Sequence, residues 1–250
     1  MEDILLYFAL KYDGDFNSIY KALESKEVVD YQLYERLKSK FKCKYTTLVS
    51  KNYPNKLKEI DCPPFVLFYY GDLSLLEDKI VAVVGKRKTS EYGKRVTRNI
   101  TSELVKNDYT VISGISTGTD VIAHQTAINE NGRTIAISGC GIDLIYPKSN
   151  QHLFDLIKND HLLISEYPYN TKPEKKRFTK SNRLISGLSN GVIVTECDKE
   201  SSSMIVTRFA IEQNKDVYCV PSNIDNEYQG CNQLIKHGAD IFISVEDLDF

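Results

Sequence analysis

The chain has 250 residues, of which 42% are hydrophobic and 26% charged, and its formal net charge is −2. These values are typical of a globular protein with one sizeable α/β core and room for a small accessory domain. The mild acidity excludes a uniformly basic surface, so any nucleic-acid site must be a local patch. No apolar run reaches the about 20 residues of a membrane helix. The start MEDILLYFALKYDGD lacks the basic residues of a signal peptide, so we expect a cytoplasmic protein.

Cysteine and histidine patterns give no sign of a metal site or a cofactor. The six cysteines contain no CxxC pair, which argues against both a zinc ribbon and a disulfide framework. The four histidines show neither HxxxH nor HExxH spacing. We therefore expect reduced thiols and no bound metal or cofactor.

Residues 1–75 are rich in Lys and Tyr and lack repeated strand-then-glycine units. Apolar residues recur at helical spacing within three stretches, 4–9, 19–23 and 33–41. The intervening YDGD and SKEVVD indicate turns. We expect a small helical domain and linker over residues 1–75, serving nucleic-acid binding, a protein partner or packing alone. An edge strand is predicted at Phe65 to Tyr70, after the Pro63-Pro64 break.

From residue 76 to 250, strand and helix patterns alternate. Strands are predicted at 80–84, 110–112, 134–138, 162–164, 191–195, 216–220 and 240–243. Helical patterns between them include 92–107, 119–130, 149–158 and 203–213. Because βαβ connections are right-handed, this order predicts an α/β fold, a doubly wound, Rossmann-like parallel sheet covered on both faces. Ligands of such sheets bind outside the carboxyl ends of the strands.

The first strand of this region, 80–84, is a continuous apolar run that ends in GKRK, residues 85–88. This segment has neither the GxGxxG spacing of dinucleotide binders nor the GK[ST] of a P-loop. A guanidinium beside a strand-end turn suits bidentate phosphate contacts, so Arg87 is a candidate phosphate ligand. Lys94 and Arg98, on the following helix, are expected on a solvated face.

The next strand ends in SGISTGTD, residues 113–120. Two such strand ends side by side can hold a phosphate chain between backbone N–H groups and helix N-termini. Gly114 and Gly118 permit close backbone approach, and Asp120 can cap the helix that begins there. The alternative is a tight β-to-α turn without a ligand. We expect His124 to be a packed or capping residue, since no nucleophile is placed beside it.

A basic segment, TKPEKKRFTKSNRLISGLS, occupies residues 171–189. Its six cations, set against the single Glu174, are Lys172, Lys175, Lys176, Arg177, Lys180 and Arg183. Such a cluster would neutralise several phosphates and make binding fall with salt. Lys172 and Lys176 also fit a mobile solvated loop. Asn182 and Arg183 begin an apolar helical pattern, so we expect them to be held in a fixed orientation.

Paired carboxylates for acid–base catalysis are not evident. Glu166 and Glu196 are single carboxylates at the ends of separate strands. A hydrolase could use these two residues, but nothing in the sequence indicates that they meet.

Taken in order, these segments resemble the DNA-processing protein A family, also called DprA or Smf. The matching residues are VAVVGKR (81–87), SGISTGTDVIAH (113–124), GCGIDLIYP (139–147), ISEYP (164–168), FTKSNRLISGLS (178–189), TECDKESSSMIVTRFAIEQ (195–213), VYCVPSNID (217–225) and GCNQLIKHGA (230–239). As an ordered set the motifs are specific, although each alone is weak. They cover the whole Rossmann-like part, and residues 53–72 look like the family's linker.

The resemblance implies a non-enzymatic protein that binds single-stranded DNA without strong sequence preference and forms a homodimer. It also implies that the protein protects incoming strands and loads the recombinase RecA onto them in natural transformation or homologous recombination. Carried over by motif, the DNA pocket consists of Gly85, Arg87, Ser113, Gly114, Gly118, Lys175, Asn182 and Arg183.

Two departures from the family pattern matter. Ser181 stands where the family's F-P-x-R-N-R motif has an arginine. Lys86 and Lys180 are expected to offset that lost charge, which adds both to the predicted pocket. The sequence ends at Phe250, so we expect a version without the C-terminal winged-helix domain of some members.

Two other functions stay open from the sequence. The first alternative is an enzyme, because related Rossmann-like folds resemble phosphoribohydrolases that cleave nucleotides. Glu196 and Glu200 stand where those enzymes have a glycine-rich catalytic loop, but the glycines of that loop are missing here. The second alternative is a recombinase adaptor whose basic residues contact protein instead of DNA.

Overall fold

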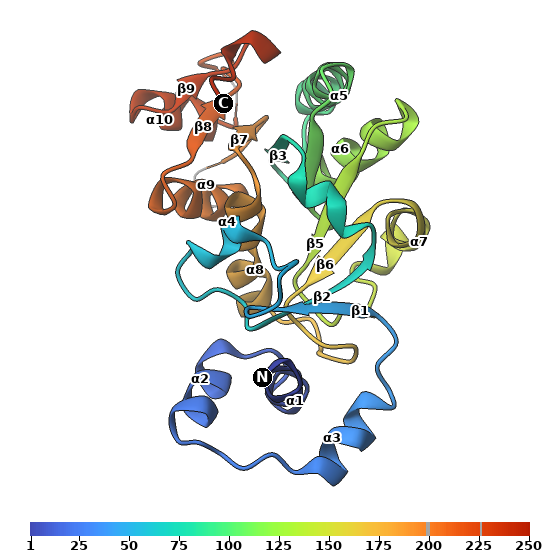
Figure 1. Ribbon diagram of the computed structural model, residues 1–250. Helices are drawn as coiled ribbons and strands as arrows, with labels where there is room; N and C mark the ends of the chain where they lie inside the picture. The colour runs from blue at the N-terminus through green and yellow to red at the C-terminus, as the bar shows by residue number, and fades with distance from the viewer. Residues whose placement is uncertain (199–200, 226) are drawn as a thin grey trace.

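The computed structural model describes residues 1–198, 201–225 and 227–250 (Figure 1). Its helices are α1 (Glu2–Lys11), α2 (Phe16–Glu24), α3 (Tyr31–Lys38), α4 (Asn55–Lys58), α5 (Glu91–Lys106), α6 (Thr119–Asn129), α7 (Gln151–Asp160), α8 (Lys175–Leu188), α9 (Ser202–Glu212) and α10 (Gly230–Lys236). Short 3-10 turns lie at Leu73–Glu77, Lys148–Asn150 and Val245–Asp247. None of the helices in these described ranges has the length and apolar character needed to cross a membrane.

Within the same residues, nine strands form one sheet in the order β1-β2-β6-β5-β4-β3-β7-β8-β9. The strands are β1 (Lys44–Thr47), β2 (Val66–Gly71), β3 (Ile80–Val84), β4 (Thr110–Gly114), β5 (Thr134–Ser138), β6 (Leu162–Ser165), β7 (Gly191–Val194), β8 (Asp216–Cys219) and β9 (Asp240–Ile241). All pairs from β6 to β9 are parallel, whereas β1 and β2 run antiparallel to their neighbours. The predicted α/β fold with a Rossmann-like parallel sheet is confirmed.

Successive residues of β3 face opposite sides of the sheet, as the period of two in a strand requires. Ala82 and Val84 share a core with α4, α8 and α9. Val81 and Val83 share another core with α5 and α6. Both faces of the strand are therefore buried, which explains its uninterrupted apolar sequence.

The order of the strands reverses at β3. From β3 the chain runs through β4 and β5 to β6 on one side, then returns to place β7 against the other side of β3. The helices that follow β3 and β7, α5 and α9, cover opposite faces of the sheet. Their loops therefore diverge and leave a crevice at the carboxyl ends of these two strands.

The N-terminal helices α1, α2 and α3 lie together at one end of the molecule (Figure 1). Asp15 and Asp30 begin α2 and α3, because their carboxylates accept hydrogen bonds from the N–H groups of Ser18 and Leu33. The residues of α1 from Leu5 to Leu10 are buried in a core that continues into β2, β5 and β6. The N-terminal helices are thus attached to the sheet through α1.

The strand predicted at Phe65 to Tyr70 does not lie at the edge of the sheet. It forms β2, but β1 pairs with its outer side and β6 with its inner side, so β2 is not an edge. The sequence KYTT of β1 is short and lacks apolar alternation, and for that reason we did not predict it. Because residues 44–71 contribute two strands to the sheet, the purely helical part reaches only to Lys38. A separate domain over residues 1–75 stays a prediction.

Phe68 in β2 joins the core of α1 to the sheet. It is fully buried, and its ring meets that of Phe41 edge-on at 5.6 Å. We expect Phe68→Ala to lower the free energy of unfolding in urea by about 3–5 kcal/mol, since a large cavity would remain. Tyr31→Ala, at a position 73% exposed, should change it by less than about 0.5 kcal/mol. Equal effects from the two substitutions would contradict this assignment of the core.

Candidate functional site

A cavity with a volume of about 880 Å³ lies at the crevice between the loops after β3 and β7. Its lining residues come mainly from these loops, from the loop after β4, from Ile137 in β5, from Tyr146 and Pro147, from Pro173 and the first three turns of α8, and from the first turn of α9. This is the place where the reversal of strand order favours a ligand site.

Glycines hold the loop after β3 against the start of α6. The N–H of Thr119 donates to the carbonyl oxygen of Lys86 over 3.0 Å. Gly118 has a φ of +77°, which L side chains rarely adopt, and a Cβ there would collide with the carbonyl oxygens of Lys86 and Arg87. Gly118 does not line the cavity. It shapes the loop that presents Arg87 to it.

Three exposed cations surround the cavity. Arg87, Lys88 and Lys175 line it and are exposed. Within the described part of the chain, none of the three has a carboxylate at ion-pair distance. Lys86 differs, because its Nζ is 2.8 Å from the Asp198 carboxylate and 3.1 Å from the centroid of the Tyr228 ring. An anionic ligand would therefore meet Arg87, Lys88 and Lys175 first.

The acidic residues at the cavity are engaged by other groups. The Asp120 carboxylate accepts hydrogen bonds from the backbone N–H and the hydroxyl of Ser116, at 3.1 and 2.8 Å. Asp120 therefore closes the loop after β4 instead of capping α6, whose N-cap residue is Gly118. Glu174 forms ion pairs with its neighbours Lys176 and Arg177. Their negative charges are partly compensated.

The first turns of α8 and α9 supply further anion-binding groups. Their N-cap residues, Glu174 and Ser201, form no side-chain cap hydrogen bond. The first N–H groups of a helix have no partner within the helix and carry partial positive charge. Two helix starts at one cavity, beside exposed cations, suit the oxygens of phosphates.

Two aromatic rings give the cavity an apolar wall. Tyr146, which is 51% exposed, and Phe178 both line it, and their ring centroids are 5.5 Å apart. We did not predict these residues as ligands, although both lie in motifs that carry the family resemblance. They are 32 positions apart in the sequence, and only the fold brings them together.

Of the ten residues predicted to bind DNA, the cavity brings six together. They are Gly85, Lys86, Arg87, Gly114, Lys175 and Asn182. Gly118 supports the loop from beneath. Ser113 is buried, and its hydroxyl donates to the carbonyl oxygen of Val83 over 2.7 Å, so it is not placed to meet a ligand. Lys180 lies outside the cavity, with its Nζ 5.7 Å from the ring centroid of Phe16.

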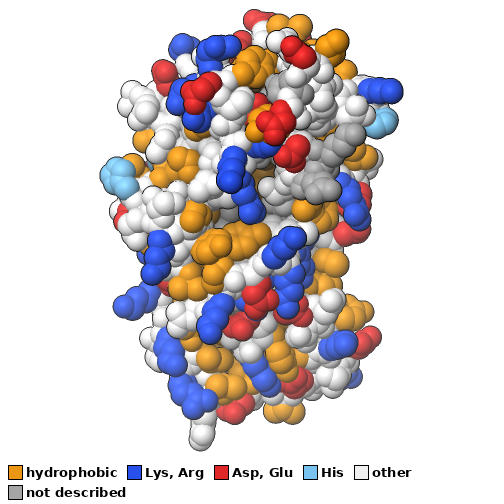
Figure 2. All heavy atoms as spheres, turned by 180° about the vertical axis from the view of Figure 1, so that it is seen from behind, with side chains coloured by type: hydrophobic (Ala, Val, Ile, Leu, Met, Phe, Trp, Pro, Cys, Tyr) orange, Lys and Arg blue, Asp and Glu red, His pale blue; other side chains and the backbone are white. Residues whose placement is uncertain are grey.

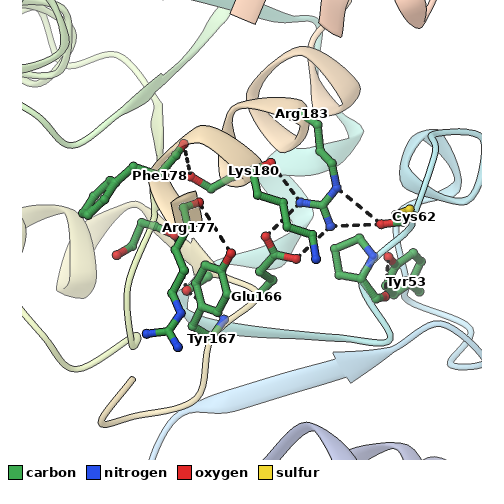
Figure 3. Close-up of polar contacts among 12 residues, drawn as sticks. Tyr53, Cys62, Glu166, Tyr167, Arg177, Phe178, Lys180 and Arg183 are labelled. Atoms are coloured by element: carbon green, nitrogen blue, oxygen red, sulfur yellow. Dashed lines mark hydrogen bonds and ion pairs between the residues drawn. The ribbon is translucent and has the colours of Figure 1, made fainter. Parts of the chain in front are cut away.

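Arg183 has a structural position instead of a ligand-facing one (Figure 3). Its guanidinium is buried and donates to both carboxylate oxygens of Glu166, over 2.8 and 2.7 Å. It also donates to the backbone carbonyl oxygens of Cys62 and Lys180, over 2.9 and 3.0 Å. The fixed orientation predicted for Arg183 is correct, but its donors are engaged within the protein, and the predicted DNA contact does not fit this placement.

The remaining catalytic candidates are also engaged. Glu196 accepts hydrogen bonds from the side chain of Thr89 and from the N–H and hydroxyl of Ser90. His124 is buried between Thr134 and the carbonyl group of Gly114, as expected for a packed histidine, and burial lowers its pKa. Glu166 and Glu196 thus serve different networks. Glu200 lies outside the described residues.

The Arg183–Glu166 pair provides a test of that structural assignment. We expect Arg183→Ala and Glu166→Ala each to lower the free energy of unfolding by about 3–5 kcal/mol, because either leaves a buried charge unpaired. Replacing both residues by Met and Leu should cost less than either single change. Denaturation in urea measures all three. A loss of DNA affinity in Arg183→Ala without loss of stability would contradict the structural role.

Sequence comparisons identify relatives over most of this chain. The family model described as DNA recombination-mediator protein A matches residues 44–249. DNA processing protein DprA of Streptococcus pneumoniae is 42% identical over 197 residues, 78% of this chain and 70% of that protein. Protein Smf of Synechocystis sp. is 42% identical over 202 residues, 79% of this chain and 51% of that protein. This chain therefore spans about half the length of the Synechocystis relative.

Solved structures share the same fold. The X-ray structure of DNA processing protein A from Streptococcus pneumoniae has a TM-score of 0.83 at 33% identity, covering 98% of this chain and 91% of that one. DNA processing protein A from Helicobacter pylori, whose structure was described for its mode of binding single-stranded DNA, has a TM-score of 0.74 at 33% identity. That match covers 82% of this chain and 94% of the Helicobacter chain.

Proposed function

Because the chain belongs to the DNA recombination-mediator protein A family, we propose that it binds single-stranded DNA in the cavity after β3 and β7. The observation that carries the proposal is the combination of exposed cations, helix starts and aromatic rings around one cavity. The Helicobacter relative, which binds single-stranded DNA, supports it.

The arrangement favours a single strand over a duplex. Arg87, Lys88 and Lys175 suit backbone phosphates, which carry no sequence information. Tyr146 and Phe178 can stack on bases only when those bases are free of a partner strand. On the face shown in Figure 2, hydrophobic side chains lie between groups of Lys and Arg. Binding should therefore tolerate any sequence and weaken with salt.

The proposed binding of single-stranded DNA involves neither a cofactor nor a chemical reaction. Glu196, the carboxylate that a phosphoribohydrolase-like activity would need, accepts hydrogen bonds that fasten Thr89 and Ser90. Its role is to hold the start of α5. Release of free base from nucleotides, detected by chromatography, would support the enzymatic alternative instead.

The resemblance to the family supports a proposal about partners. The protein would act as a cytoplasmic homodimer. It would protect incoming strands and load the recombinase RecA onto them, in natural transformation or in homologous recombination. If the basic residues served only the recombinase as an adaptor surface, DNA and the recombinase would compete for them.

Substitution of the exposed cations tests the cavity. We expect Arg87→Ala and Lys175→Ala each to weaken binding of labelled oligothymidylate. Each should also flatten the slope of log affinity against log salt by about 0.7, the value for one lost phosphate contact on a single strand. Fluorescence anisotropy at several salt concentrations measures both effects.

Lys94→Ala is the matched control for these substitutions. Lys94 lies on α5 outside the cavity and pairs with Glu91 over 2.6 Å, so its loss should change neither affinity nor slope appreciably. Comparable effects from all three substitutions would mean that any positive charge on the protein surface contributes equally to DNA binding. That result would contradict a specific pocket.

Phe178 tests the stacking component separately. Phe178→Ala should weaken single-strand binding about tenfold, since base stacking on an aromatic side chain contributes about 1–3 kcal/mol. The salt slope should stay unchanged, because no phosphate contact is lost. Phe178→Tyr keeps a ring and should bind nearly as well as the native protein. If Phe178→Ala binds normally while remaining folded, bases do not stack there.

A further inference from the structure

Outside the cavity, three aromatic rings form a stack between α2 and the chain before β2. The rings of Phe16 and Phe65 have centroids 5.0 Å apart and are inclined by 17°. The ring of Tyr20, one turn along α2, is 6.2 Å from that of Phe16 and inclined by 18°. Tyr20 is 51% exposed, so the stack ends in a ring that solvent can reach.

Helix α8 brings cations to this stack. The Lys180 ammonium lies 5.7 Å from the centroid of the Phe16 ring, and Lys176 precedes it by one helical turn. At the start of α2, burial opposes ionisation of Asp15, but hydrogen bonds from Ser18 and the charges of Lys180 and Lys176 hold its pKa below the ordinary value. Both lysines therefore act on the N-terminal end of α2.

The two faces of α8 connect the stack to the cavity. Lys175, Phe178 and Asn182 line the cavity. Lys176 and Lys180, which are four residues apart, share a neighbouring face. The helix rises about 1.5 Å per residue, so Lys175 and Lys180 are only about 7.5 Å apart along its axis. A strand that leaves the cavity at the start of α8 can reach the second face within a short distance.

We propose that Tyr20, Phe16, Lys176 and Lys180 form a second subsite for the same single strand of DNA, at which a base stacks on Tyr20. The inference rests on the proposed function and extends the binding path from the cavity to the N-terminal helices. Lys180, which the sequence placed in the DNA pocket, would contact DNA at this second subsite instead.

The chemistry of the surface favours this ligand. Stacked rings beside cations at helical spacing match alternating bases and phosphates, and such platforms tolerate any sequence. Of the acidic groups nearby, Asp15 is used to begin α2, since its carboxylate accepts from the N–H and hydroxyl of Ser18 at 3.0 and 2.8 Å. Glu174 pairs with Lys176 and also with Arg177, each over 3.2 Å. Within the described residues Lys180 has no ion-pair partner and is available to a phosphate.

A single tryptophan provides the direct test, because the native sequence contains none. Tyr20→Trp keeps an aromatic ring at the end of the stack and makes it the sole tryptophan. Oligothymidylates of about 4 to 16 nucleotides, the range of single-strand site sizes, would be titrated while anisotropy reports binding. We expect the shortest bound oligonucleotides to leave tryptophan fluorescence unchanged and longer ones to quench it.

Tyr31→Trp is the matched control. Tyr31 lies in α3, is 73% exposed and is outside the aromatic stack, so a tryptophan there should not respond at any length. Binding of long oligonucleotides without quenching of Trp at position 20 would overturn the second subsite and leave the cavity intact. Absence of binding at every length would instead overturn the proposed function itself.

Affinity gives an independent readout. Tyr20→Ala and Lys180→Ala should each weaken binding of long oligothymidylates about tenfold or less, as expected for one stacked base or one phosphate. Neither should change binding of the shortest oligonucleotides, which occupy the cavity alone. Tyr31→Ala should be neutral at all lengths. Equal losses for short and long oligonucleotides would contradict a separate subsite.

Discussion

The buried ion pair between Arg183 and Glu166 fixes the helix on which the rest of the binding surface depends. Glu166 follows β6, and Arg183 lies midway along α8, so their two short hydrogen bonds attach the helix to the end of the sheet. The same guanidinium donates to the carbonyl oxygen of Cys62, in the segment before β2. A charged pair is costly to bury, but its directional bonds allow few alternative positions for α8.

From this position α8 serves two surfaces. Its first turn carries a cation and an aromatic ring to the cavity, Asn182 adds an amide further along the helix, and the neighbouring face carries two lysines to α2. The opposite wall of the cavity depends on Gly118, whose backbone conformation lets the loop after β3 approach α6 and turn Arg87 outward. A protein with a net charge of −2 can therefore present a local cationic surface, because its acidic residues near the cavity are held by other donors.

Much of the fold could be predicted from the sequence, because the parallel strands are buried on both faces and read as continuous apolar runs. The loop containing Arg87 was found for the same reason, since it follows directly after such a strand. β1 was missed because four residues without alternation carry little signal. The buried position of Arg183 does not follow from the cationic pattern, because neighbouring residues of a helix differ by about 100° in direction. Asn182 faces the cavity, whereas Arg183 turns into the core, and the cluster of cations in the sequence did not distinguish them.

The wall formed by Tyr146 and Phe178 and the stack formed by Phe16, Phe65 and Tyr20 could not be predicted, because each joins segments far apart in the chain. Selection of a single strand by these surfaces is tested most directly by equilibrium binding at two salt concentrations. Labelled single-stranded and duplex oligonucleotides of the same sequence would be compared. We expect tighter binding to the single strand and weaker binding at higher salt. Equal binding to both forms, or no binding to either, would contradict it.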